Sequence, residues 1–93
     1  MKKTEKEFLS ALAGYSMYWA NIPVERLEPA SFETIEEART NGLIHSILVL
    51  LRGDSGANDF KPYRIQRGKS IIGEDEYLPS RYFETFKKVK GVE

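Results

Sequence analysis

The chain has 93 residues, of which 41% are hydrophobic and 30% charged, and this balance predicts one folded domain over residues 1–93 rather than a disordered chain. The 14 basic and 14 acidic side chains give a formal net charge of zero, which removes the strong positive field of a dedicated nucleic-acid binder. The absence of cysteine excludes thiol catalysis and thiolate metal sites. With no long apolar segment either, the sequence predicts a cytoplasmic protein without membrane contacts.

The first expected element is an amphipathic helix. Residues 4–7 match a capping box, in which the Thr4 hydroxyl accepts from the backbone N–H of Glu7 at the helix start. Pro23 disfavours helix at the residue before it, so the helix should end near Asn21. One apolar stripe at helical spacing is formed by Phe8, Leu12, Tyr15 and Trp19.

A second capping box at residues 34–37 predicts a short helix that begins after Thr34. Asn41 and Gly42 resemble a helix stop, with Gly42 in the left-handed conformation that follows a last turn. The connection over residues 22–33 contains two prolines and should be extended. Its expected apolar anchors are Ile22, Val24, Leu27 and Phe32.

The apolar segment 43–51 fits two structures. As a helix over residues 43–52, it gathers His45, Ser46 and Val49 on one face, and Gly53 ends it. As a strand, it would be buried on both faces. The clustering of polar residues at helical spacing favours the helix.

Residues 52–59 contain Arg-Gly-Asp and Gly-Asp-Ser-Gly, which occur in integrin ligands and around the nucleophile of chymotrypsin-like proteases. An intracellular protein has no integrin to bind, and 93 residues cannot supply the two barrels of such a protease. The glycines and short polar residues here are those that turns require, so we expect a loop.

A β-hairpin is expected over residues 60–72, with Arg67 and Gly68 as its turn. A last helix should span residues 80–90 and end at Gly91, with three lysines in its final turn. Its apolar stripe is expected to be Tyr82, Phe83, Phe86 and Val89. The order of elements predicts a small α+β fold.

The order helix, short helix, helix, hairpin also resembles that of the winged helix-turn-helix proteins. In that resemblance, Ala38 is the small residue of the first helix, Gly42 the turn, and the hairpin the wing. The wing carries four cations and no acid, which suits phosphate contacts. The recognition helix, however, offers few polar groups to base edges, so DNA binding is the second hypothesis.

Nothing in the sequence indicates a reaction. His45 is the only histidine, and with no cysteine it has no partners for a metal site. No glycine-rich phosphate loop is present. We therefore expect no cofactor and no enzymatic activity, and a small enzyme or enzyme subunit is the third hypothesis.

The leading hypothesis is a small non-catalytic intracellular module that binds another protein, as an adaptor or an inhibitor. Tyrosine and arginine dominate protein interfaces because they combine large contact area with polar ends. A chain of this size cannot bury all eleven of its aromatic side chains, so some should be exposed. The candidate binding residues are Tyr18, Tyr63, Arg64, Arg67, Lys69, Tyr77, Arg81 and Tyr82.

Overall fold

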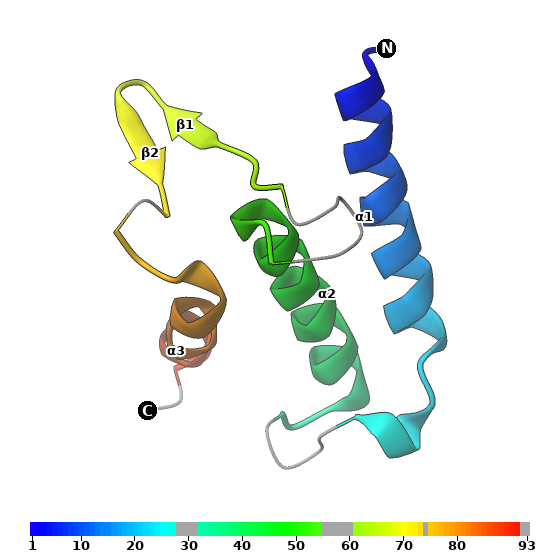
Figure 1. Ribbon diagram of the computed structural model, residues 1–93. Coiled ribbons are helices and arrows are strands. Elements are labelled where there is room, and N and C mark those ends of the chain that lie inside the picture. The colour runs from blue at the N-terminus through cyan, green and yellow to red at the C-terminus, as the bar shows by residue number, and fades with distance from the viewer. Residues whose placement is uncertain (28–31, 55–60, 74, 92–93) are drawn as a thin grey trace.

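The computed structural model describes residues 1–27, 32–54, 61–73 and 75–91. In these ranges the chain forms three α-helices, one short 3₁₀ helix and a two-stranded antiparallel hairpin, which agrees with a small α+β fold (Figure 1). The elements are α1 (Lys3–Asn21), η1 (Val24–Arg26), α2 (Ile35–Arg52), β1 (Ile65–Arg67), β2 (Ser70–Ile72) and α3 (Leu78–Lys90). None of the helices in these ranges is both long and apolar enough to cross a bilayer.

Helix α2 is the centre of the molecule and packs against both α1 and α3 (Figure 1). The hairpin lies beyond the start of α3, beside the carboxyl end of α2. Its position is fixed by the backbone N–H of Tyr63, which donates to the Leu51 carbonyl oxygen at 2.9 Å. The Tyr63 ring also contacts the Phe8 ring of α1, with ring centres 5.0 Å apart. The segment before β1 is thus held by two helices.

Helix α1 ends at Asn21 before Pro23, as predicted. Its apolar stripe is also confirmed, because Phe8 contacts Tyr63 and Trp19 donates through Nε1 to Ser46 Oγ of α2 at 2.9 Å. The capping box at Thr4 is wrong. The helix begins two residues earlier, after the extended residue Lys2, so Thr4 lies within the first turn and its hydroxyl is not placed to cap the helix.

The predicted helix stop at Gly42 is also wrong. Helix α2 is continuous through this residue, and Gly42 is not among the glycines with positive φ. The reason is packing: a Cβ at Gly42 would lie 2.6 Å from two atoms of the Trp19 ring, so glycine allows the indole to approach the helix axis. Residues 43–52 are therefore helical rather than a strand, and they continue the helix that starts after Thr34.

Both ends of α2 lie where the sequence predicts a helix start and a helix end. The Thr34 hydroxyl accepts from the Glu37 backbone N–H at 3.0 Å, and Gly53 ends the helix in the left-handed conformation with φ 89°. The Glu37 carboxylate reaches back to the backbone N–H of Glu33 rather than to that of Thr34. The predicted cap at Thr34 therefore forms, but the carboxylate of Glu37 accepts from the residue before Thr34 instead of from Thr34 itself.

The buried apolar cluster is small. It consists of Ile22, Leu27 and Ala38, with Trp19 and Phe32 packed against it. The prediction that Val24 is an apolar anchor is wrong, because η1 turns its side chain outward and leaves it 50% exposed. The most buried side chain of the described residues is Leu50, at 1% exposure near the end of α2. It is covered because α2 has neighbours on two sides.

The hairpin is shorter than predicted. Its strands pair Ile65 with Ile72 and Arg67 with Ser70, so the turn is Gly68 and Lys69, one residue later than expected. Residues 61–64 are not in a strand, and residue 60 lies outside the described residues. Gly68 supplies the positive φ, 59°, that moves the turn to this position.

Helix α3 begins two residues earlier than predicted, because Pro79 fits a first turn, where no intrahelical bond to its nitrogen is needed. It ends at Gly91 with φ 86°, as expected. The prediction that Val89 belongs to the apolar stripe of α3 is wrong. At the far end of α3 it points away from α2 and is 82% exposed. Of the loop predicted over residues 52–59, Arg52 is helical, and residues 55–59 lie outside the described ranges.

Candidate functional site

A groove of about 540 Å³ lies between the hairpin, the carboxyl end of α2 and the start of α3. We call it the hairpin groove. Its apolar lining comes from all three elements, and it consists of Leu48, Leu51, Pro62, Ile65, Ile71, Ile72, Leu78 and Pro79. Aliphatic side chains that are only partly covered form a surface on which an apolar group gains by burial.

Close backbone contacts hold the groove together. Gly53 lies against the segment before β1, so that a Cβ there would be 2.8 Å from the Pro62 nitrogen. Gly73, with φ 84°, brings the chain after β2 against the Leu78 side chain. Both close approaches depend on the absence of a side chain at a glycine. The hairpin groove therefore forms where Gly53 and Gly73 let the hairpin pack beside the end of α2 and the start of α3.

The rim of the groove is charged. The Arg52 guanidinium lies over the Tyr77 ring, 4.9 Å from its centre, and 3.9 Å from an Asp54 carboxylate oxygen. Glu76, also on the rim, pairs with Arg81 at 2.9 Å. Arg64 lines the groove from the strand side and forms no ion pair with a described residue. Among the described residues, the rim thus has one cation without a carboxylate partner.

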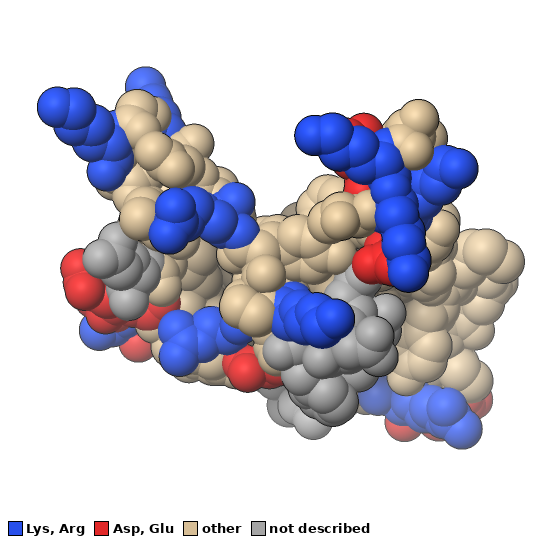
Figure 2. Space-filling model, turned by 45° about the horizontal axis from the view of Figure 1, so that its top comes forward, with Lys and Arg blue, Asp and Glu red and all other residues tan. Residues whose placement is uncertain are grey.

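The zero net charge conceals an uneven distribution of charge. The end of the molecule shown at the top of Figure 1 includes residues 1–7, 52–54, 61–73 and 75–76. These segments carry eight of the 14 basic side chains and five of the 14 acidic ones. Figure 2 shows basic side chains projecting from the hairpin on the left and from the start of α1 on the right, with a hollow between them.

The cations of the two ends also differ in their partners. At the opposite end, Lys90 bonds to Glu37 and also pairs with Glu33, and Arg39 donates to two carbonyl oxygens at the end of α1. On the hairpin side, no described carboxylate pairs with Lys61, Arg64, Arg67 or Lys69. Cations without an internal partner are available to an external anion.

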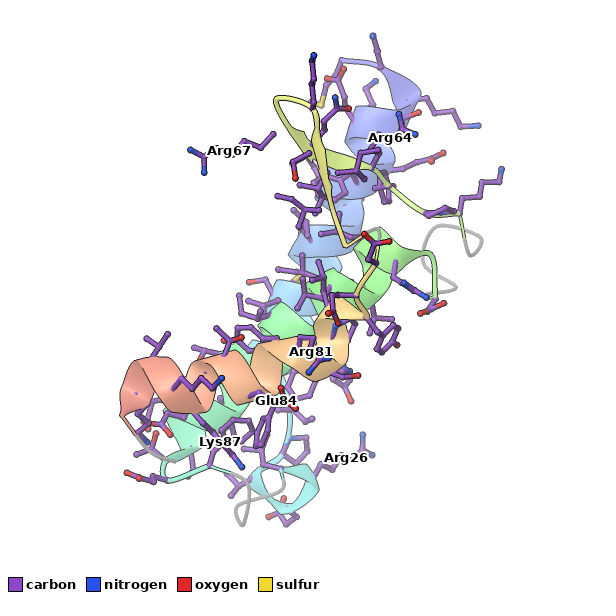
Figure 3. All side chains as sticks on the ribbon, turned by 90° about the vertical axis from the view of Figure 1, so that its left-hand side faces the viewer. Arg26, Arg64, Arg67, Arg81, Glu84 and Lys87 are labelled. Atoms are coloured by element: carbon purple, nitrogen blue, oxygen red, sulfur yellow. The ribbon has the colours of Figure 1, made fainter. Side chains whose placement is uncertain are left out.

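The structure brings some of the predicted site residues together. Tyr63 and Arg64 line the hairpin groove, Tyr77 contacts Arg52 at its rim, and Arg67 and Lys69 lie at the hairpin tip. Figure 3 shows Arg64 and Arg67 on the hairpin, well separated from Arg81 on α3.

The other three predicted residues lie elsewhere. Arg81 is held by Glu76 and Glu84, and the hydrogen bond that it donates to Glu76 is the main cause that raises the pKa of its guanidinium. Tyr82 faces the opposite side of the molecule, where its ring lies 6.4 Å from that of Phe86. Tyr18 is exposed on α1, outside the hairpin groove.

The aliphatic floor of the groove was not predicted from the sequence, because leucines and isoleucines at helix or strand spacing indicate a core. The signal that could have revealed it is the length of the apolar run in α2, which covers more of the helix surface than one neighbour can bury. Among residues 1–27, 32–54, 61–73 and 75–91, no three acidic or histidine side chains converge as metal ligands.

Comparison of the chain with protein-family models, curated proteins and solved structures finds no match. The function is therefore argued from the residues of the groove themselves.

Proposed function

We propose that this protein is a non-catalytic module that binds an acidic, partly apolar segment of another protein in the hairpin groove. The observation that carries the proposal is the combination of an aliphatic floor with cations that pair with no carboxylate of the described residues. An apolar side chain of the partner covers the floor, and neighbouring carboxylates pair with Arg64 and with the cations at the hairpin tip. The lack of cysteine supports a cytoplasmic location.

This pattern fits a protein segment better than a DNA backbone. A phosphate backbone gains nothing from an aliphatic surface, whereas an amphipathic peptide needs one. The winged-helix alternative has also lost its central feature, because α2 continues through Gly42 where a helix-turn-helix protein would turn. The basic hairpin is the one feature that still favours DNA, so DNA binding is measured alongside.

The mode of binding follows from the shape of the site. The groove accepts an extended or helical segment along the hairpin, and two short strands leave both edges of the hairpin unpaired within the described residues. A module that binds in this way acts as an adaptor or an inhibitor through occupancy alone. No group of the groove is arranged as a nucleophile with a neighbouring base.

The test is a selection from a phage-displayed library of random linear peptides, followed by affinity measurements by fluorescence anisotropy. The test variant combines Arg64→Ala, Arg67→Ala and Lys69→Ala. The control combines Arg26→Ala, Lys87→Ala and Lys88→Ala, which removes the same charge from exposed positions outside the groove. A third variant, Ile71→Ser, removes apolar area from the floor.

Enriched peptides should combine acidic residues with leucine, isoleucine or phenylalanine. The hairpin variant should bind them at least about tenfold more weakly, as expected for the loss of two or three charge-assisted contacts, and the control within about twofold of wild type. Ile71→Ser should weaken binding by about tenfold, because burial of its aliphatic side chain is lost. Selection of no acidic motif, or equal losses in the hairpin and control variants, would contradict the proposal.

The DNA arm uses a mixed-sequence duplex at two salt concentrations. Weak binding that falls within the non-specific range of about 10⁻⁴ to 10⁻⁶ M near physiological salt is the expected result. Submicromolar binding that the hairpin variant abolishes, with a salt slope reduced by up to about 3, would replace this proposal with the winged-helix alternative.

A further inference from the structure

A second groove, of about 530 Å³, lies on the other side of the molecule, between the end of α1, η1, α2 and α3. We call it the aromatic groove. Its walls are the rings of four aromatic residues, and of the residues lining the hairpin groove it shares only Pro79. The wall residues are Trp19, Phe32, Tyr82 and Phe83.

Asn41 of α2 lines this groove and has an unsatisfied acceptor. Its side chain is among the most buried polar groups of the described residues, at 6% exposure. The amide nitrogen Nδ2 donates to the Glu37 carbonyl oxygen at 2.8 Å, which fixes the orientation of the amide, because a carbonyl oxygen cannot pair with Oδ1. Oδ1 is buried and has no hydrogen-bond partner. Such an orphan acceptor is rare in folded proteins and calls for a donor.

The shape and charge of the groove limit what that donor can belong to. Ala38 and Gly42, the smallest residues of α2, also line the groove, one turn apart, and the absence of a side chain at Gly42 lets the Trp19 ring lie close to α2. Phe32 already contacts Phe83 edge-to-face, with ring centres 5.5 Å apart, so the walls offer both edges and faces to a further ring. The titratable residues of the lining are Arg26, His45 and Tyr82, of which Arg26 and His45 are exposed and Tyr82 is partly buried. The interior therefore favours an uncharged aromatic group.

We propose that the aromatic groove binds a small uncharged aromatic molecule that carries one ring N–H or O–H, and that this group donates to Oδ1 of Asn41. A free small molecule fits better than a polypeptide segment, because Oδ1 is buried and a compact ring displaces fewer of the side chains that cover it. The proposal requires those side chains to move apart when the molecule binds. This proposal is independent of the hairpin groove and of the partner proposed there.

The experiment compares two probes that differ in one donor. Indole carries a ring N–H, and 1-methylindole has the same ring without it. Each is titrated by isothermal calorimetry into the full chain and into Asn41→Leu, which replaces the acceptor by an apolar side chain of similar size. Far-UV circular dichroism confirms that the variant keeps its helices, and the comparison of the two probes on wild type stands even where the variant does not fold.

Wild type should bind indole about tenfold more tightly than 1-methylindole, the ratio expected for one buried hydrogen bond. Asn41→Leu should bind the two probes equally. The variant that lacks Arg64, Arg67 and Lys69 should bind indole like wild type, which separates this site from the hairpin groove.

Three results would overturn the proposal. The first is the absence of binding by either probe, and the second is equal affinity of the two probes for wild type. The third is tighter binding of N-acetyltryptophanamide than of indole, which would assign the groove to a tryptophan side chain of a partner protein.

Discussion

Gly42 and Gly14 are both interior to a helix, and the structure predicts opposite consequences of replacing them with alanine. At Gly14 of α1, nothing lies within 4 Å of the position that a Cβ would occupy. At Gly42 of α2, the same atom would lie 2.6 Å from Cε3 and Cη2 of the Trp19 ring, closer than carbon atoms approach one another. The two substitutions therefore share the backbone effect and differ in packing.

The magnitudes follow from these two terms. Alanine in place of glycine stabilises an unhindered helix interior by about 1 kcal/mol, and Gly14→Ala should show this gain. Forcing a methyl group into an occupied position costs about 1–3 kcal/mol. The free energy of unfolding of Gly42→Ala should therefore lie about 1–3 kcal/mol below that of Gly14→Ala. In a domain of this size, each 1 kcal/mol corresponds to about 4–8 °C in Tm.

Urea and thermal denaturation followed by circular dichroism measure this difference. Trp19 is the only tryptophan, so its fluorescence also reports the same contact. In a Trp19→Leu background the clash is absent, and Gly42→Ala should then stabilise the chain as Gly14→Ala does; the double-mutant cycle isolates the packing term. Equal Tm shifts for the two glycine substitutions in the wild-type background would refute the packing of Trp19 on α2.

Three further predictions concern helix ends and an ion pair. Gly53→Ala should lower the free energy of unfolding by about 1 kcal/mol or more in urea melts, because φ is 89° and the Pro62 nitrogen is 2.8 Å from the new Cβ; an unchanged midpoint would contradict it. Thr34→Ala should cost about 1 kcal/mol through loss of the α2 cap, whereas Thr34→Ser should be nearly neutral, so similar losses in both would argue against capping. Lys90→Met removes the cation whose hydrogen bond lowers the pKa of Glu37 from its ordinary value of 4.5. Because a lowered folded-state pKa stabilises the fold above the unfolded value, wild type should exceed Lys90→Met in Tm at neutral pH. The two curves should converge as the pH falls through the folded-state pKa of Glu37, and a difference that persists in strong acid would exclude this ion pair as its cause.

Much of the fold was determined by local sequence signals. Gly53 and Gly91 end their helices because only glycine adopts positive φ without strain. Pro23 sets the end of α1, and Thr34 caps the start of α2. The basic character of the hairpin could also be predicted from the sequence, because Arg64, Arg67 and Lys69 occur in a segment without acidic residues. These features depend on neighbours in the chain, so a sequence can specify them.

The tertiary structure decided the features that depend on distant residues. The local preference of Gly42 to end a helix amounts to about 1 kcal/mol, and the packing of α2 between two other helices exceeds it. The same packing gives Leu50 the deepest position and leaves Leu48 and Leu51 as the floor of a groove.

The separation of charge into a basic end and a paired end also required the fold, because residues 1–7 and 61–73 are far apart in the sequence and lie at one end of the molecule only in the folded chain. Asn41 shows the same dependence. Its sequence context resembles a helix stop, and the four aromatic rings of the groove that it lines come from α1, the segment before α2, and α3. A sequence specifies which groups are polar, but whether a polar group finds a partner depends on which elements surround it.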